Sequence, residues 1–204
     1  MNPLLPWTSQ RDWILASASP RRASILRMLG FEFEVEPTNA ETEPLDEPEP
    51  LAHSRAQARR KAVAGTRGRQ RGTCIGADTI VVVDGDILGK PGSAEEALAM
   101  LQRLRGRWHL VHTGLALQDV ESGRGVDGVE STEVRFRHWD DATLQRYVAT
   151  GECADKAGAY AIQGFGAMLV QEIRGCFYNV MGFPVQRFLS LLEELHDVEV
   201  RSGR

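Results

Sequence analysis

The chain has 204 residues, of which 42% are hydrophobic and 25% are charged, and its formal net charge at pH 7 is −4. This length suits one domain of two lobes, or at most two small domains, and the composition is typical of a globular protein with an ordinary core. The negative net charge argues against general nucleic-acid binding, because that function needs a basic face.

Positive charge is nevertheless concentrated in two stretches of the chain. The first holds Arg55, Arg59, Arg60 and Lys61, and the second holds Arg67, Arg69 and Arg71. A local concentration of this kind favours a small polyanion as ligand over a long duplex.

The cysteines and the hydropathy pattern indicate where the protein works. Cys74, Cys153 and Cys176 are odd in number, widely spaced and without the pairing of a zinc site, which indicates a reducing compartment. The sequence has no transmembrane run, and residues 1–11 lack the apolar core of a signal peptide. We therefore expect a cytoplasmic protein that does not bind membranes.

The most informative local pattern lies near the amino terminus. Residues 13–16 are apolar and predict a strand, residues 17–22 form a hydroxyl-rich turn, and an apolar helical pattern follows directly. Pro20 suits the first helical position, and Ser17 and Ser19 can cap the helix or donate to an anion. The start of this helix is therefore a predicted phosphate site.

Two arginines in the first turn of that helix support the prediction. Arg21 and Arg22 stand where acidic residues are preferred, so they cost stability unless an anion is bound there. The alternative, which the local pattern leaves equally open, is that both arginines are solvated surface residues on an ordinary capped helix.

An acidic loop and a helix follow. Alternation predicts a strand with one buried face over residues 31–35, and residues 36–50 are rich in Glu and Pro without periodicity. This long loop can supply a metal-binding carboxylate, although a solvated acidic loop explains most of its acids. Residues 51–64 predict a helix ended by Gly65, with Leu51, Ala58 and Ala62 on one face and Arg59 or Lys61 left to reach elsewhere.

Asp78 interrupts an apolar, β-branched run over residues 73–83, which predicts a strand. A buried carboxylate must be paired, protonated or bound to a cation, and a kink at residues 76–77 can instead aim it into a cleft. The alternative is an aspartate at a strand end that caps a turn. A hairpin turn at residues 84–85 and a return strand at 87–88 lead into the loop 89–92.

The middle of the chain holds a predicted helix, which we interpret as scaffold, and two predicted strands. Ser93 starts a capping box and a helix that runs to Leu104, and strands are predicted over residues 108–117 and 126–137. His109 and His112 differ by three positions on a strand, so they face opposite sides and do not suit one metal ion. We interpret both as polar strand residues.

The carboxyl-terminal part holds a predicted ligand loop. Asp140 caps a helix through Val148, and residues 155–164 combine small residues with the polar handles Lys156, Tyr160 and Gln163. Gln163 carries a donor and acceptors, so it can read the edge of a base. A tight glycine turn with surface polar residues is the alternative.

The last elements complete a predicted α/β fold. A strand over residues 168–173 precedes the segment 179–184, which starts a final helix that ends near Leu195. Because both hairpins and crossovers occur, the sheet is predicted to be mixed and twisted, with flanking helices.

Seven motifs together resemble the Maf family of nucleoside triphosphate pyrophosphatases. They are ASASPRR (16–22), ARRKA (58–62), GADT (76–79), GKP (89–91), HTG (112–114), DKAGAYAIQG (155–164) and NVMGFP (179–184). The resemblance spans residues 13–195 and leaves 1–12 and 196–204 as polar terminal extensions. It implies an elongated, two-lobed single domain with a central cleft, of the Maf and ITPase-like kind, and a homodimer.

The resemblance also implies an activity. Family members hydrolyse a nucleoside triphosphate between the α and β phosphates, which gives a monophosphate and pyrophosphate, and they use a divalent cation, Mg or Mn. Asp78 matches the proton acceptor and Arg21, Lys61 and Lys90 match phosphate-handling positions. Glu41, in the acidic loop, matches an acid that holds the metal together with Asp78.

Specificity follows from the same resemblance. Arg21, Thr79 and Gln163 match the branch similar to dTTP/UTP pyrophosphatases, whereas the branch acting on 7-methyl-GTP replaces parts of that pattern. Four further residues are expected to bind substrate: Ser17, Ser19, Arg22 and Lys156.

Two other functions fit the same motifs. The first is a nucleotide-binding regulator of septum formation without significant turnover, since the family is associated with inhibition of septation and cell-division arrest. The second is a related house-cleaning enzyme that acts on deaminated purines. The intact Asp78 and Lys90 make the regulator the weaker hypothesis, and a comparison of ITP with UTP and dTTP distinguishes the enzyme acting on deaminated purines.

Overall fold

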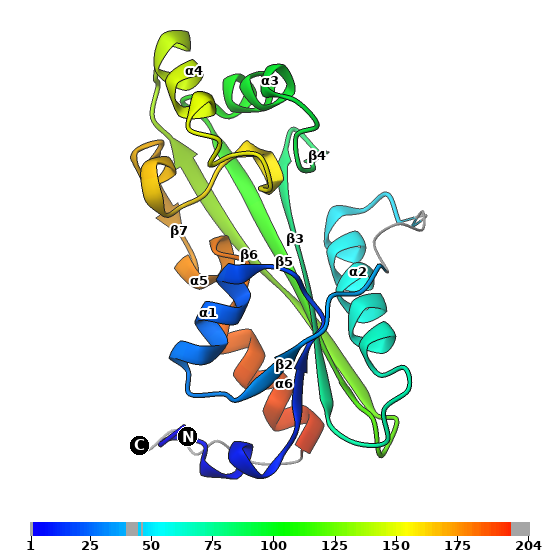
Figure 1. The fold of residues 1–204 in the computed structure, drawn as a ribbon. Coiled ribbons are helices and arrows are strands. Elements are labelled where there is room, and N and C mark those ends of the chain that lie inside the picture. Colours follow the sequence, from blue (N-terminus) through cyan, green and yellow to red (C-terminus); the bar gives the residue numbers. More distant parts are fainter. Residues whose placement is uncertain (1, 40–44, 46, 197–204) are drawn as a thin grey trace. The chain divides into compact units, whose positions relative to one another are not determined.

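A computed structural model describes residues 2–39, 45 and 47–196 of the chain. Seven strands of this described part form one sheet in the order β2-β1-β3-β5-β6-β7, with β4 paired to β3 (Figure 1). The strands are β1 (Trp13–Leu15), β2 (Phe33–Val35), β3 (Thr73–Val83), β4 (Asp86–Leu88), β5 (Trp108–Asp119), β6 (Gly125–Phe136) and β7 (Val170–Arg174).

Six α-helices and three short 3₁₀ helices are described with the strands. The α-helices are α1 (Pro20–Met28), α2 (Pro50–Gly65), α3 (Ala94–Leu104), α4 (Asp141–Ala149), α5 (Phe177–Val180) and α6 (Val185–His196). The 3₁₀ helices are η1 (Pro6–Gln10), η2 (Ala157–Ala159) and η3 (Gly164–Met168). None of these described helices has the length and apolar character needed to cross a membrane.

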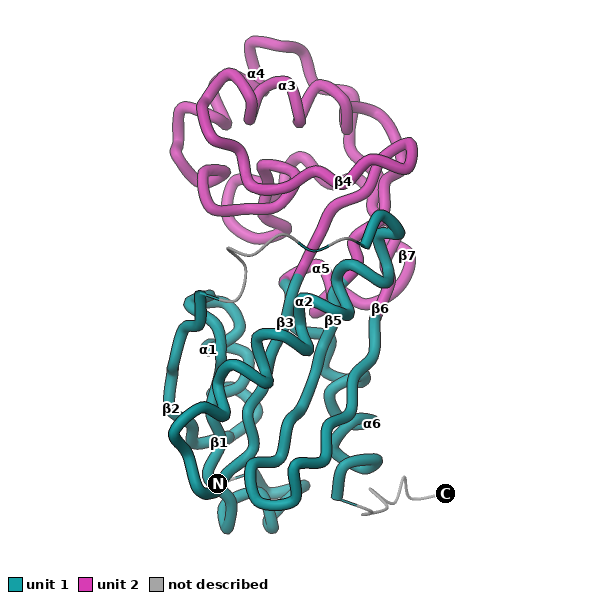
Figure 2. Tube along the Cα trace, turned by 90° about the vertical axis from the view of Figure 1, so that its right-hand side faces the viewer, with its two compact units in different colours: residues 1–78, 113–129, 182–204 teal, residues 79–112, 130–181 magenta. Residues whose placement is uncertain are grey.

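The sheet is mixed, as the sequence predicts. β1 pairs in parallel with both β2 and β3, whereas β4 runs antiparallel to β3 and β7 antiparallel to β6. The mixed α/β fold class is therefore confirmed. The chain divides into two compact units, shown in teal and magenta in Figure 2, and β3, β5 and β6 each contribute residues to both.

The first unit comprises residues 1–78, 113–129 and 182–204. Its strands carry α2 on one face and α1 and α6 on the other (Figures 1 and 2). Aromatic rings fill the α6 side, where Phe31 lies 5.2 Å from Trp13 and 5.4 Å from Phe188 between ring centroids. Alanines fill the α2 side, where Ala58 and Ala62 pack with Ala116 of β5.

The second unit comprises residues 79–112 and 130–181. Its core joins α3 and α4 to the strands through apolar side chains. Fully buried examples are Leu101 and Leu104 of α3, Leu144 of α4, and Val134 and Phe136 of β6. Burial of this apolar surface is the main source of stability for the unit.

Several predicted elements are confirmed with their end signals. The β3–β4 hairpin turns at residues 84–85, where Asp84 and Gly85 both have positive φ. Ser93 accepts a hydrogen bond from the backbone N–H of Glu96 at the start of α3, and Asp140 accepts one from Thr143 at the start of α4. These local signals act as predicted because each partner lies three residues away.

Two elements differ from the prediction. The strand expected over 31–35 is only β2 (Phe33–Val35), and its expected buried face is lost because Val35 is 46% exposed. Among the described residues β2 pairs only with β1 and stands at the end of the strand order, so its side chains are covered less than those of an inner strand.

The final helix also begins later than expected. Residues 177–180 form the separate helix α5, and α6 starts at Val185. Gly182, with φ of +97°, lies between them and cannot continue a right-handed helix.

The amino-terminal residues, expected as a polar extension, are packed. η1 forms there, Asn2, Leu5 and Thr8 are buried, and the Trp7 ring meets His196 edge-on at 5.3 Å. Residues 197–204 lie outside the described part of the chain.

Candidate functional site

In the first unit the predicted phosphate site follows β1, and Asp78 lies on the neighbouring strand β3. β1 ends at Leu15, which is paired with Ile75 of β3, so Ser17 follows the carboxyl end of β1 and Asp78 lies three residues beyond the pairing on β3. Ligands of open α/β sheets commonly bind outside the carboxyl ends of parallel strands. The topology thus places the start of α1 where a ligand is expected, with Asp78 on the strand that pairs with β1.

Asp78 is paired with Lys61. The Lys61 Nζ donates to Asp78 Oδ1 at 2.8 Å and to the Ala77 carbonyl oxygen at 3.3 Å. The Lys61 side chain is only 3% exposed and that of Asp78 is 17% exposed. Of the three states predicted for a carboxylate in this strand, the structure has the paired one, and the alternative of a turn cap at a strand end is wrong because Asp78 lies inside β3.

Gly76 makes this ion pair possible. A Cβ atom at this position would lie 2.1 Å from the Ala58 carbonyl oxygen and 2.5 Å from the Ala62 backbone nitrogen. Only glycine therefore lets α2 approach β3 so closely. Lys61 lies between those two alanines in the sequence and contacts Asp78. This agrees with the prediction that Arg59 or Lys61 reaches away from the packed face of the helix.

Arg22 is a buried structural residue. Its Nε donates to the Gly182 carbonyl oxygen at 2.9 Å, and its Nη1 donates to Ser17 Oγ at 2.9 Å and to the Ala77 carbonyl oxygen at 2.8 Å. The alternative of a solvated surface arginine is wrong for Arg22, which is 8% exposed. Arg22 instead fixes the start of α1 beside the strand that carries Asp78.

The serines act differently from the capping prediction. Ser19 occupies the N-cap position of α1 but makes no side-chain capping bond. Ser17 Oγ accepts hydrogen bonds from Arg22 and from the Ser19 backbone N–H, the latter at 3.3 Å. Ser17 thus helps to hold the turn, while Ser19 and Arg21, both half-buried, stand at the start of the helix.

Four arginines of the two arginine-rich stretches are paired with carboxylates. Arg55 and Arg59 both pair with Asp127 of β6, and Arg59 does so at 3.1 Å. Arg69 pairs with Glu34 and Glu36, and these hydrogen bonds raise its pKa. Arg71 pairs with Asp12 at 2.7 Å. The carboxylate partners lie far away in sequence, so composition alone overstates the positive charge.

The second unit holds the other predicted residues. Lys90 and Gln163 are exposed, and Thr79 and Lys156 are half-buried. The Lys156 ammonium pairs with the neighbouring Asp155. The segment before Gln163 is tied to the segment of Lys90, because the Gly158 backbone N–H donates to the Gly89 carbonyl oxygen at 3.0 Å.

A buried aromatic cluster supports the same loop. His109 Nε2 and the Tyr160 hydroxyl are 2.8 Å apart, and both rings meet Phe136 edge-on, with centroids 5.0 and 4.7 Å away. Burial lowers the pKa of His109 to about 3 and raises that of Tyr160. His112 instead contacts Ser131 Oγ at 2.8 Å, so the interpretation of both histidines as polar strand residues is confirmed.

The described residues can supply one carboxylate to a divalent cation at this site. They contain no group of three or more His, Cys, Asp and Glu side chains placed to hold a metal ion. Mg²⁺ is often bound by one or two carboxylates together with substrate phosphates and water. Asp78 fits such a shared site, and Glu41 lies outside the described residues.

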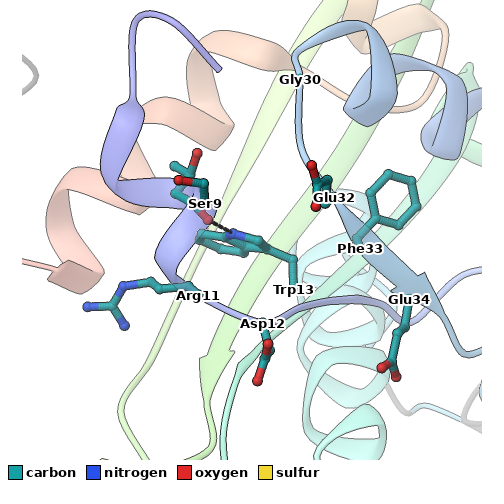
Figure 3. Close-up of a pocket in the computed structure, with 9 residues that line it drawn as sticks. Ser9, Arg11, Asp12, Trp13, Gly30, Glu32, Phe33 and Glu34 are labelled. Carbon is teal, nitrogen blue, oxygen red and sulfur yellow. Dashed lines mark hydrogen bonds between the residues drawn. The ribbon is translucent and has the colours of Figure 1, made fainter. Parts of the chain in front are cut away.

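A small pocket of the first unit lies apart from these residues. Its cavity volume is about 210 Å³, and Figure 3 shows the carboxylates of Asp12, Glu32 and Glu34 around it. The predicted site residues are absent from its described lining, which consists of Thr8, Ser9, Arg11, Asp12, Trp13, Gly30, Glu32, Phe33 and Glu34.

Comparison with known proteins agrees with the motifs. The model of the family described as Maf-like protein matches residues 12–195. A dTTP/UTP pyrophosphatase of Thermotoga maritima is 45% identical over 94% of this chain and 93% of its own length. Proteins of the same name from Thermococcus kodakarensis and Thermococcus onnurineus are 46% and 48% identical, over 91% and 88% of this chain and 97% and 96% of their own lengths. The chain belongs to the Maf-like protein family.

Proposed function

We propose that the protein hydrolyses dTTP and UTP between the α and β phosphates to give the monophosphate and pyrophosphate. The observation that carries the proposal is the ion pair between the buried Lys61 and Asp78, which lies inside β3 and beside the start of α1. The names of relatives that are 45 to 48% identical support the same reaction and substrates.

Asp78 acts in this proposal as the acceptor for the proton of the attacking water. Lys61 donates to Oδ1 at 2.8 Å and so fixes the orientation of the carboxylate, which leaves the proton to Oδ2. Water attacks the α phosphorus. The bond from this phosphorus to the oxygen that bridges the α and β phosphates breaks, and pyrophosphate leaves with the bond electrons. Lys61 is close enough to the carboxylate to stabilise it before each turnover.

The start of α1 holds phosphate oxygens. Ser19 and Arg21 stand at its first turn, where backbone N–H groups and the helix dipole favour an anion. Lys90, which is exposed, is a further proposed phosphate contact. A divalent cation, Mg or Mn, would neutralise further phosphate charge when bound, and Asp78 and Glu41 are the carboxylates that we propose would hold it.

Thr79, Gln163 and Arg21 select the nucleotide, with Lys156 as a further substrate contact. The exposed Gln163 amide can pair with a base edge that presents both a donor and an acceptor, as uracil and thymine do. Because Arg21 is one of the three residues proposed to select the nucleotide, we expect Arg21→Ala to change the preference among nucleotides. A uniform loss across all nucleotides would contradict the selective role of Arg21.

The test measures pyrophosphate release from UTP, dTTP, CTP, GTP and ITP with Mg²⁺ or Mn²⁺. Wild-type protein should release pyrophosphate fastest from UTP and dTTP, and Asp78→Asn should lower kcat by about 100-fold or more. Asp86→Asn, on the neighbouring strand β4, is the matched control and should retain activity. Nucleotide binding without pyrophosphate release would instead establish a regulator without turnover, and unchanged activity of Asp78→Asn would refute the assigned role.

We also propose that the protein is a cytoplasmic homodimer. All three cysteines are free thiols in the structure, which agrees with a reducing compartment. Light scattering of the purified protein tests the dimer, and a monomer at micromolar concentration would refute it.

A further inference from the structure

The loop that carries Gln163 is held by the carboxylate of Glu152. The Phe165 backbone N–H donates to Glu152 Oε2 at 2.9 Å, and the Gly166 backbone N–H donates to Glu152 Oε1 at 2.9 Å. Both donors lie within three residues of Gln163. Hydrogen bonds from backbone N–H groups to an acidic side chain are stronger than those between neutral groups.

Tyr147 holds the other side of the same loop. Its hydroxyl accepts a hydrogen bond from the Ala161 backbone N–H at 3.3 Å and donates one to Glu152 Oε1 at 3.2 Å. Tyr147 belongs to α4 and is 5% exposed, and its burial raises its pKa. Glu152 and Tyr147 thus form one network, which binds the chain on both sides of Gln163.

The loop closes tightly around the carboxylate. Gly164 has φ of +64°, and a Cβ atom there would lie 2.3 Å from Glu152 Oε2. A side chain at this position would therefore displace Glu152, and the backbone conformation also favours glycine. Gln163 itself is exposed and makes no capping bond to η3, so its amide is presented to solvent from a backbone fixed at Ala161 and Phe165.

We propose that Glu152 is a positioning residue for nucleotide selection, which holds the Gln163 amide where it reads the pyrimidine edge. The inference rests on the proposed function, since it requires Gln163 to face the substrate base. Glu152 touches no substrate in this arrangement and acts only through the backbone of residues 161–166. Its loss lets the loop adopt other conformations, so the base must order the loop at the cost of affinity.

A double-mutant cycle with Glu152→Gln and Gln163→Ala tests the inference. Glutamine keeps the size of glutamate but turns an NH₂ group toward one of the two backbone N–H donors. We expect Glu152→Gln to raise the KM for UTP and dTTP by about 10-fold, with a smaller effect on CTP and GTP. Because both residues act through the same amide, the double variant should be no less selective than Gln163→Ala alone.

Two further variants make the test specific. Glu172→Gln removes a carboxylate of β7 that pairs with Arg174 at 3.2 Å, and it should leave the KM values unchanged. Tyr147→Phe removes the hydroxyl from the network without changing the charge, and it should reduce selectivity in the same direction as Glu152→Gln. Thermal unfolding of each variant shows whether it is folded. If Glu152→Gln does not fold, Tyr147→Phe takes its place in the test.

The outcomes separate this inference from the proposed function. Absence of pyrophosphate release by the wild type refutes the proposed function. In that case calorimetry measures the nucleotide affinities of the same single and double variants, and these affinities test the positioning role. Additive losses in the double variant, or unchanged selectivity in both Glu152→Gln and Tyr147→Phe, overturn the positioning role. The positioning role is supported if Gln163→Ala and Glu152→Gln each lose selectivity and the losses do not add in the double variant.

Discussion

The burial of His109 predicts a measurable dependence of stability on pH. The side chain is 3% exposed, and desolvation lowers its pKa from 6.5 to about 3 in the folded protein. The unfolded chain therefore takes up a proton near pH 6.5 that the folded chain accepts only near pH 3. Stability contributed by the neutral histidine is present above pH 6.5 and is lost as the pH falls through this window.

The size of the effect follows from the two pKa values. With an unfolded pKa of 6.5 and a folded pKa of about 3, lowering the pH from about 7.5 to about 5 costs about 2 kcal/mol of unfolding free energy. The substitution His109→Gln removes the titrating group and keeps an acceptor for the Tyr160 hydroxyl. We therefore expect this variant to lose about 2 kcal/mol less than the wild type between these two pH values.

Urea unfolding at both pH values measures the difference. Carboxylates titrate in both proteins and cancel in the comparison, because only residue 109 differs. Tyr160→Phe serves as the control, since it removes the hydroxyl but leaves His109 buried, and it should retain the acid sensitivity of the wild type. Equal losses in the wild type and His109→Gln would refute the argument that burial determines the pKa of His109.

Three further substitutions test the first unit by urea unfolding and pyrophosphate release. Gly76→Ala places a Cβ atom 2.1 Å from a backbone oxygen of α2 and should destabilise by about 3 kcal/mol, whereas Gly89→Ala, with open space around it, should change stability by less than about 0.5 kcal/mol. Lys61→Met leaves the Asp78 carboxylate unpaired and should cost about 3 kcal/mol, part of which Asp78→Asn should restore; a purely additive double variant would contradict the pairing argument. Arg22→Lys keeps the charge but loses the fork of hydrogen bonds, so it should cost about 2 kcal/mol, whereas a role in phosphate binding alone predicts unchanged stability.

Local chemistry explains why much of the second unit could be predicted. The hairpin at residues 84–85 and the starts of α3 and α4 depend on partners within three residues of each other. Their signals are complete inside a short window of sequence. Even here the capping box is altered, because the Glu96 side chain accepts from the Gly92 backbone N–H at 2.7 Å and not from that of Ser93.

Long-range contacts explain the incorrect predictions. Asn179 was expected to start the final helix, but its buried side chain donates to the Val111 carbonyl oxygen and to Thr132 Oγ1, both at 2.9 Å. Its partners lie 68 and 47 residues away, so no local pattern contains them. Arg22 is similar, since one of its acceptors is 160 residues away. A periodic pattern cannot separate such a residue from a surface cation.

The Glu152 network shows why positioning residues escape sequence reasoning. A glutamate after a helix and a glycine reads as a surface acid, and its acceptor role appears only when the loop folds back over it. The sequence signal was instead in Gly164, whose positive φ and close approach to Glu152 favour glycine. Glycines of this kind mark close contacts, although they do not identify the partner.

The contact between α2 and β3 joins two motifs that the sequence presents separately. Ala58 and Ala62 meet the backbone of β3 at Gly76, and Lys61, on the same helix turn, is carried to Asp78 two residues farther along the strand. The small residues therefore determine the distance between the charged ones. A larger residue at any of these three positions would separate Lys61 from Asp78 without changing either charge. The ARRKA and GADT motifs thus form one structural element, in which the packing of small residues brings Lys61 within hydrogen-bonding distance of Asp78.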